Sequence, residues 1–143
     1  MLFRSLLVQR VFGEEGVDPG RIVLGHSGDT TDADHLCQLA DAGFVLGMDR
    51  FGINLATTFE ARADIVVEMC RRGYAGQLVL AHDTNCYIDW LAPGVREFMP
   101  QWHYLHIEQD VLPYLREHGV TEQQIETMLV DNPRRVLETV EPY

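Results

Sequence analysis

Residues 44–50 read Phe44-Val-Leu-Gly-Met-Asp-Arg50 and set the pattern for the whole chain of 143 residues. Five residues without charge come first and two charged residues follow, a pattern typical of a buried strand that ends in a polar loop. A helical pattern that begins with a capping box at Thr31 and Asp34 precedes this strand and stops at Gly43. A strand that is apolar on both faces and follows an amphipathic helix predicts a parallel sheet.

The same pattern occurs once on either side. Arg21-Ile-Val-Leu-Gly25 leads into His26, and Gln77-Leu-Val-Leu-Ala81 leads into His82 and Asp83. Other segments show helical spacing or turn signals, and we expect helices over 5–15, 57–72, 103–118, 121–130 and 133–138, with a long loop over 84–101. The alternation of strands and helices predicts an α/β fold with right-handed crossovers.

Composition excludes several classes of protein. Eleven basic and 22 acidic residues give a net charge of −11, which argues against binding to nucleic acid or to an anionic membrane. The apolar segments are too short to span a bilayer, and the N-terminus lacks the pattern of a signal peptide, so we expect a cytoplasmic protein. The three cysteines are widely spaced and form no CxxC pair, which predicts neither a disulfide framework nor a zinc knuckle.

Candidate functional residues follow the strands, because in parallel sheets chemistry takes place just beyond the carboxyl ends of the strands. His26 offers an imidazole that suits zinc and similar divalent ions, and Asp83 could bind a metal or accept a proton. One histidine and one aspartate are too few for a catalytic metal, which usually takes three protein ligands. A purely structural interpretation therefore stays open, in which His26 caps the next helical turn and Asp83 makes a loop hydrogen bond.

Two other polar clusters favour ordinary structural roles. The acidic loop Asp29-Thr-Thr-Asp-Ala-Asp34 lacks the glycine and glutamate spacing of an EF-hand, so we interpret it as a solvated helix N-terminus. His103 and His106 lie three residues apart, a spacing that can place two ligands on one helix face. No acidic third ligand has an obvious position, so the sequence favours partly buried histidines without a metal.

The strand ends resemble the C-terminal part of a phosphotriesterase-family protein of the amidohydrolase superfamily. The resemblance rests on Gly25-His-Ser-Gly-Asp-Thr30, Gly47-Met-Asp-Arg-Phe-Gly52 and Leu80-Ala-His-Asp83, with Cys86, Ile88-Asp-Trp90 and Asp131-Asn-Pro-Arg-Arg135 in support. These segments occur in order from about Leu7 to Glu138. The Asp49-Arg50 pair and the loop through Trp90 are more similar to the lactonase branch of the family than to the organophosphate-degrading branch.

The resemblance implies the C-terminal portion of a (β/α)₈ TIM barrel, about strands six to eight with their flanking helices. Residues 1–143 would form one partial-barrel domain that is incomplete as a barrel, because such barrels typically need about 250 residues. By the same resemblance His26 and Asp83 are metal ligands, Asp83 and Arg50 are catalytic, and Arg50 and Trp90 line the substrate pocket. The implied cofactor is a binuclear divalent metal centre, with zinc as the expected metal.

The implied reaction is attack of a metal-activated hydroxide on a small-molecule lactone or organophosphate ester. The family's first-strand His-x-His, its bridging carboxylated lysine and its fifth-strand histidine have no counterpart, and all eleven basic residues are arginine. We therefore expect the chain to be inactive without an N-terminal half. By itself it should either be poorly stable or associate through its open barrel face, for example with a second copy of the chain. The alternatives are a half-barrel remnant or interaction module that binds no metal, and an unrelated flavodoxin-like domain.

Overall fold

A parallel sheet of three strands forms the centre of the computed structural model, which describes residues 2–55, 57–89, 92 and 94–138. The strands β1 (Val23–Leu24), β2 (Val45–Met48) and β3 (Leu78–Leu80) lie in the order β1-β2-β3. Their register pairs Val23 with Val45 and Met48 with Leu80. The predicted parallel sheet is confirmed, although each strand is shorter than the apolar run that predicts it.

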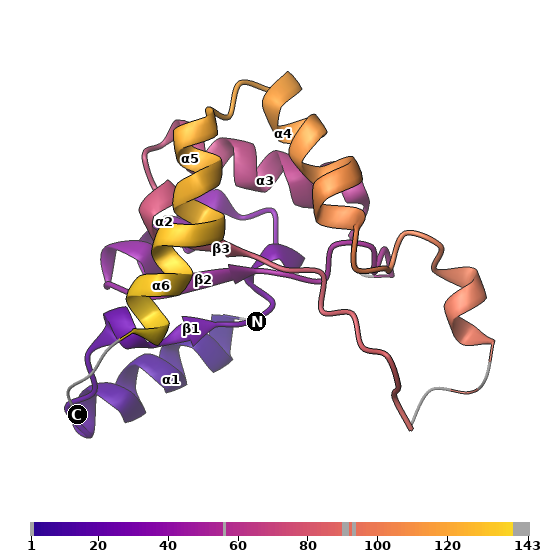
Figure 1. Ribbon diagram of the computed structural model, residues 1–143. Helices are drawn as coiled ribbons and strands as arrows, with labels where there is room; N and C mark the ends of the chain where they lie inside the picture. The colour runs from indigo at the N-terminus through magenta and orange to yellow at the C-terminus, as the bar shows by residue number, and fades with distance from the viewer. Residues whose placement is uncertain (1, 56, 90–91, 93, 139–143) are drawn as a thin grey trace.

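Six α-helices surround the sheet within the described ranges (Figure 1). They are α1 (Leu2–Glu14), α2 (Ala33–Asp41), α3 (Phe59–Arg71), α4 (Leu112–Glu117), α5 (Glu122–Glu126) and α6 (Asn132–Leu137). Short 3₁₀ turns cover Pro19–Arg21, Ser27–Asp29, Ala75–Gln77 and Val95–Phe98. No helix in these ranges is both long enough and apolar enough to cross a membrane.

Two of the predicted helix starts are one residue too early. The side chain of Asp32 caps α2 by accepting a hydrogen bond from the backbone N–H of His35 at 3.0 Å. Thr58 caps α3 in the same way, through the N–H of Ala61. In both places two capping residues stand side by side in the sequence, and the spacing alone does not separate them. The capping box of Thr121 with Gln124 is confirmed.

Prolines shape the last two helical runs. A π-helical segment, Ile107–Val111, leads directly into α4, whose second residue is Pro113. A second one, Thr127–Asp131, joins α5 to α6, whose second residue is Pro133. Proline lacks an N–H and crowds the preceding turn, so the chain accommodates it with a wider i→i+5 turn just before it. Helices predicted to end near residue 130 and restart at 133 therefore form one run.

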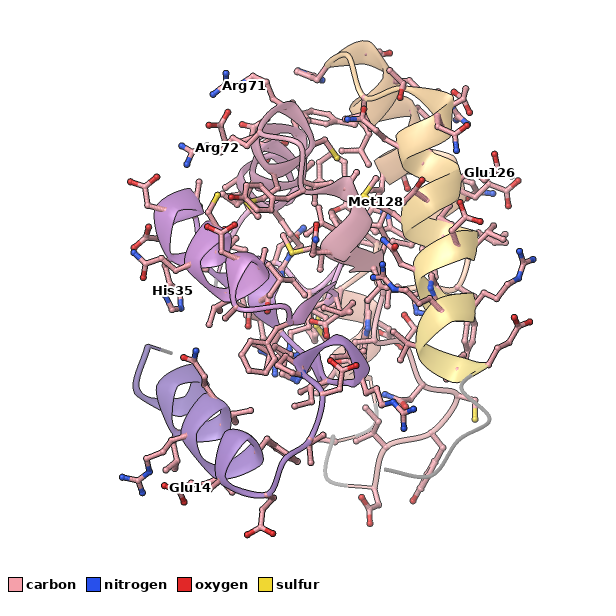
Figure 2. The ribbon with its side chains drawn as sticks, turned by 90° about the vertical axis from the view of Figure 1, so that its left-hand side faces the viewer. Glu14, His35, Arg71, Arg72, Glu126 and Met128 are labelled. Atoms are coloured by element: carbon pink, nitrogen blue, oxygen red, sulfur yellow. The ribbon has the colours of Figure 1, made fainter. Side chains whose placement is uncertain are left out.

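The core lies between the sheet and helices α2–α6. All four residues of β2 are buried, and Leu46 and Met48 belong to the same apolar cluster as Val66 and Met69 of α3. Met128 points into this cluster (Figure 2), where its sulfur accepts from the Cys70 thiol at 3.9 Å. The middle of the sheet is thus covered by helices as the sequence predicts.

The sheet edges are more open than its centre. Some of the strand residues Ile22, Leu24, Val45, Leu78 and Leu80 are expected to meet water or a partner. Val45 and Leu78 are buried, whereas the other three are only partly buried.

Helix α1 lies along one edge of the molecule, apart from the other helices (Figures 1 and 2). A cavity of about 380 Å³ is lined by Phe12 on α1, Val23 on β1 and Leu36 on α2. Phe12 and Val23 both remain substantially exposed. The β1 side of the described structure is therefore loosely packed and leaves apolar surface in contact with solvent.

Asn132 fastens the C-terminal run to the sheet. Its buried side-chain amide donates to the carbonyl oxygens of Ala75 and Leu78, each at 2.8 Å. These two carbonyls lie just before and at the start of β3. The Asp131-Asn-Pro-Arg-Arg135 segment therefore positions the strand that leads to Asp83.

Candidate functional site

The residues that follow the three strands share an uncommon backbone conformation. Among the described residues other than glycine, φ is positive only at His26 (62°), Arg50 (63°) and Asp83 (55°). A left-handed residue at a strand exit turns the chain sharply, and it costs about 1–3 kcal/mol unless the surroundings hold it in place. Such strain concentrates at functional sites, and here it marks the three residues that the sequence singles out.

These three residues line one cavity of about 750 Å³ at the carboxyl edge of the sheet. Asp29, Arg62 and Trp102 line the same cavity. The predicted convergence of His26, Arg50 and Asp83 is therefore present. Trp90, the fourth predicted site residue, lies outside the described residues.

Asp49 holds His26 at two points. Its Oδ2 accepts a hydrogen bond from the His26 backbone N–H at 2.9 Å, and its Oδ1 lies 2.9 Å from the His26 Nδ1. Gly47 makes room for this arrangement, because a Cβ there would lie 3.1 Å from the Gly25 Cα and 3.3 Å from the Asp49 Oδ2. His26 occupies the N-cap position of the Ser27–Asp29 turn, but its side chain makes no capping hydrogen bond. With Nδ1 occupied, the free Nε2 is the nitrogen available to a ligand.

Arg50 connects two carboxylates across the cavity. Its Nη1 donates to the Asp29 Oδ2 at 2.5 Å, and its Nε lies 3.8 Å from the Asp83 Oδ2. The Asp29 side chain is only 4% exposed, whereas that of Asp83 is 43% exposed. The expectation that Asp29 is solvated is therefore wrong. The 3₁₀ turn Ser27–Asp29 folds this carboxylate inward, and the charge pattern of the loop carries no sign of that turn.

Arg62 contacts the same carboxylate network, and it is not among the residues that the strand-end pattern predicts. Its side chain is 1% exposed, and its Nη1 donates to the Asp29 Oδ1 at 2.7 Å and to the Asp49 carbonyl oxygen at 3.0 Å. Its Nη2 donates to the Ile53 carbonyl oxygen at 3.2 Å. One signal could have revealed it: Arg62 lies on the helical stripe of Val66 and Met69, where a buried charge requires partners.

Asp83 keeps its carboxylate towards the cavity. Its backbone carbonyl accepts from the Asn85 side chain at 3.2 Å, so the predicted loop hydrogen bond involves the main chain. The neighbouring His82 has its pKa lowered, first by burial and then by the charges of His103 and His106, although Asp83 opposes the shift. The Trp102 indole donates to the His82 carbonyl oxygen at 3.0 Å, which ties the end of the long loop to this strand exit.

The donors at this edge suit a divalent metal in kind. A histidine nitrogen whose other ring nitrogen is held by a carboxylate and a partly exposed aspartate are ordinary ligands of zinc-type ions. Two such ligands do not complete a catalytic site, which takes three protein ligands. The cavity thus presents part of a metal site, beside a cationic side chain.

Comparison with known proteins identifies close relatives. The model of the phosphotriesterase family matches residues 2–137. The "Phosphotriesterase homology protein" of Mycobacterium tuberculosis is 54% identical over 138 residues, which are 96% of this chain and 42% of the relative. The "Aryldialkylphosphatase" of Saccharolobus solfataricus is 36% identical over 130 residues, 89% of this chain and 41% of the relative. The chain therefore spans about 42% of the length of the first of these curated relatives.

Solved structures of phosphotriesterase-like proteins also match this chain. The phosphotriesterase from Mycobacterium tuberculosis superposes with a TM-score of 0.91 at 54% identity, covering 94% of this chain and 42% of that structure. The organophosphorus hydrolase from Deinococcus radiodurans superposes with a TM-score of 0.82 at 29% identity, covering 93% of this chain and 42% of that structure. The three-stranded sheet with its helices is thus the C-terminal portion of a TIM barrel of this kind, and it is not closed as a barrel.

Proposed function

The chain belongs to the phosphotriesterase family, and from this premise we propose that it forms the C-terminal part of a metal-dependent hydrolase of lactones or organophosphate esters. Members of this family depend on metal ions. Membership of the family supports a hydrolase function for the chain. The observation that carries the proposal is the meeting of His26, Arg50 and Asp83 in one cavity at the carboxyl edge of the sheet.

His26 and Asp83 are the proposed metal-binding residues, and their donor types favour zinc. A bound divalent ion would supply polarisation of the ester or lactone oxygen and activation of water. Asp49 orients the His26 ring, so that Nε2 alone is free to bind. Asp83, whose side chain is 43% exposed, lines the cavity and is the proposed proton acceptor.

Arg50 is the proposed substrate-orienting residue. Its guanidinium is one-third exposed in the cavity and is held from behind by the buried Asp29. A cation fixed in this way can stabilise negative charge that develops on a carbonyl or phosphoryl oxygen. The Asp49-Arg50 pair and the similarity to lactonase structures favour lactones as the first substrates to test.

The rest of the site must come from outside these 143 residues. The relatives contain more than twice as much chain, and β1 and β3 each have one strand partner in the described structure. We therefore propose that activity requires a complementary barrel portion, placed against these two edges. A second copy of this chain is the alternative occupant.

Split-enzyme complementation tests the proposal. The chain is co-expressed with the portion of the Mycobacterium tuberculosis relative that it does not cover, and lactone hydrolysis is measured with zinc, cobalt or manganese. We expect a metal-dependent activity that falls by about 10²-fold or more in His26→Ala and in Asp83→Asn, because each removes a proposed ligand. His118→Ala and Asp34→Asn, both at exposed positions, should keep it.

Two results would overturn the proposal. A complex that forms but shows no metal-dependent hydrolysis would favour a module that binds no metal. A chain that elutes as a homodimer in size-exclusion chromatography and does not bind the complementary portion would favour self-association through the open face.

A further inference from the structure

Three potential metal ligands gather where the long segment after β3 returns to the body of the molecule, just before α4 (Figure 1). His103 and His106 occupy one turn, in which the His106 N–H donates to the His103 carbonyl oxygen at 3.2 Å. Their ring centroids lie 5.7 Å apart. Asp110 follows His106 by four residues, inside the π-helical segment Ile107–Val111. Asp110 is therefore the acidic third residue for which the sequence offers no obvious position.

His106 has an unusual environment for a histidine. Its side chain is completely buried, which corrects the expectation of a partly buried residue. Its Nδ1 lies 2.7 Å from the Asp110 Oδ2, but its Nε2 has no hydrogen-bond partner in the described part of the chain. Buried polar nitrogens are nearly always paired, so an unpaired one indicates an interaction that these residues alone do not supply.

We propose that His103, His106 and Asp110 bind one divalent transition-metal ion. One ligand atom from each residue lies within 4.8 Å of the other two. Two imidazoles and a carboxylate are a donor set that suits zinc and cobalt. This inference does not rest on the proposed hydrolase function, because none of the three residues is a strand-end ligand.

Binding an ion requires local rearrangement, because the 2.7 Å contact between the His106 Nδ1 and the Asp110 Oδ2 is shorter than the separation of two ligand atoms on one metal. Ligand atoms of a tetrahedral zinc site are about 3.3 Å apart, given bonds of about 2.0–2.1 Å. The Asp110 side chain is 46% exposed, which leaves a route for an ion and for a completing water, and its contact with the His106 Nδ1 opens as the ion binds. The Phe59 ring lies against the His106 ring, with 5.6 Å between the two ring centroids, and limits the movement of that imidazole.

Binding would fasten the end of the long loop to the start of α4. Trp102, next to His103, lines the 750 Å³ cavity and donates to the His82 carbonyl oxygen. An ion held at residues 103–110 therefore restrains one wall of that cavity. Its role would be structural, and its effect would be seen in the stability of the whole chain.

Titration of the full chain with Zn²⁺ and Co²⁺ tests the site, after treatment with a chelator and in a reducing buffer. Isothermal titration calorimetry gives the stoichiometry, visible absorption reports Co²⁺ coordination, and thermal unfolding reports stabilisation. We expect one tight ion and a raised Tm. His103→Ala and Asp110→Asn should each weaken binding by about tenfold or more and remove the Tm increase.

Matched variants separate this site from other donors. His118→Ala removes an exposed histidine, Cys86→Ser removes an exposed thiol, and both should leave binding unchanged. His26→Ala with Asp83→Asn removes the strand-end donors and should also leave it unchanged. His106 is buried and its replacement can prevent folding, so the exposed or partly exposed partners His103 and Asp110 carry the test.

Three outcomes would overturn the inference. The wild-type chain could bind no ion, which would leave His106 and Asp110 as a hydrogen-bonded pair. Binding could survive both His103→Ala and Asp110→Asn. Binding could instead be lost in the His26→Ala, Asp83→Asn double variant, which would assign the ion to the strand ends and leave the hydrolase proposal intact.

Discussion

The carboxylate of Asp49 contacts both the backbone nitrogen and the ring Nδ1 of His26, each at 2.9 Å. The two residues follow neighbouring strands, so the contact also joins the exits of β1 and β2. His26 needs this support because its φ of 62° is uncommon for a residue with a side chain. Asp49 therefore sets both the backbone and the ring orientation of a proposed metal ligand.

Asp49→Ala should destabilise the chain by about 1–3 kcal/mol, since it leaves a hydrogen-bond donor unpaired beside a strained residue. Urea unfolding followed by circular dichroism measures the change. Asp34→Ala removes a carboxylate that is 82% exposed and serves as the control, with an expected change below about 1 kcal/mol. Equal midpoints for the two variants would contradict the role given to Asp49.

Arg62→Met should cost about 3–5 kcal/mol, because it leaves the buried Asp29 without one of its two cationic partners. Arg62→Lys should not restore stability, since one ammonium cannot reach Asp29 and two carbonyl oxygens with the geometry of a guanidinium. Guanidinium chloride unfolding gives both values. Arg71→Ala, at a side chain that is 70% exposed, should change little, and an equal loss there would disprove the distinction.

Gly52→Ala should be much more damaging than Gly73→Ala, although both glycines have φ above 90°. A Cβ on Gly52 would lie 2.4 Å from the Gln101 carbonyl oxygen, whereas nothing lies within 4 Å at Gly73. Gly73→Ala should cost about 1–2 kcal/mol from backbone strain alone. Overpacking should add about 1–3 kcal/mol at Gly52, measured as the difference between the two unfolding free energies. Equal costs would show that residues 101–102 do not pack on this loop.

Cysteine reactivity should separate Cys86 from Cys70. Burial raises the pKa of the Cys70 thiol to about 11, so almost no thiolate forms there at pH 8. Cys86 is exposed and should react quickly with Ellman's reagent, while Cys70 should react only after unfolding. Cys86→Ser identifies the fast phase. Rapid labelling of Cys70 would mean that the packing between Cys70 and Met128 opens readily in solution.

Acid should weaken the chain partly through Glu68. Hydrogen bonds from Arg71 and Arg72 lower the pKa of this carboxyl from 4.5 to about 2. The charged form is therefore favoured by folding, and its stabilisation is present above pH 4.5 and lost as the pH falls towards 2. Glu68→Gln should flatten the decline of the urea midpoint between pH 5 and pH 3. Glu14→Gln, at an exposed pair, should leave the decline unchanged.

The sheet and the meeting of His26, Arg50 and Asp83 could be predicted because they depend on local pattern and topology. A short apolar run between polar segments identifies a buried strand in the sequence, and parallel strands bring their carboxyl ends to one edge of the sheet. The same rule applies to any polar residue that directly follows such a strand. Sequence reasoning thus reached the residues that line the cavity from the strand exits.

The supporting residues could not be predicted in the same way. Arg62 reaches Asp29 from a helix 33 positions along the chain, a contact that depends on tertiary packing. Asp110 lies four residues after His106, a spacing that any helical turn brings together. The Arg62–Asp29 contact is long-range, so local spacing does not predict it, whereas the complete burial of His106 follows from packing that its position in the sequence does not show. The position of Arg62 on the stripe of Val66 and Met69 indicates that its side chain is buried, but it does not show which carboxylate the arginine contacts.

The left-handed residues at the strand exits imply a conflict between the stability of the fold and the function of the cavity. His26, Arg50 and Asp83 each hold a conformation that glycine adopts at little steric cost. Laboratory evolution for heat resistance alone should therefore favour glycine or asparagine at these positions, and would remove the side chains that face the cavity. A chain evolved in this way would be more stable, but it would lack the side chains that are proposed to bind metal and substrate. The order in which these three positions change under such selection would show which of their proposed roles is maintained longest.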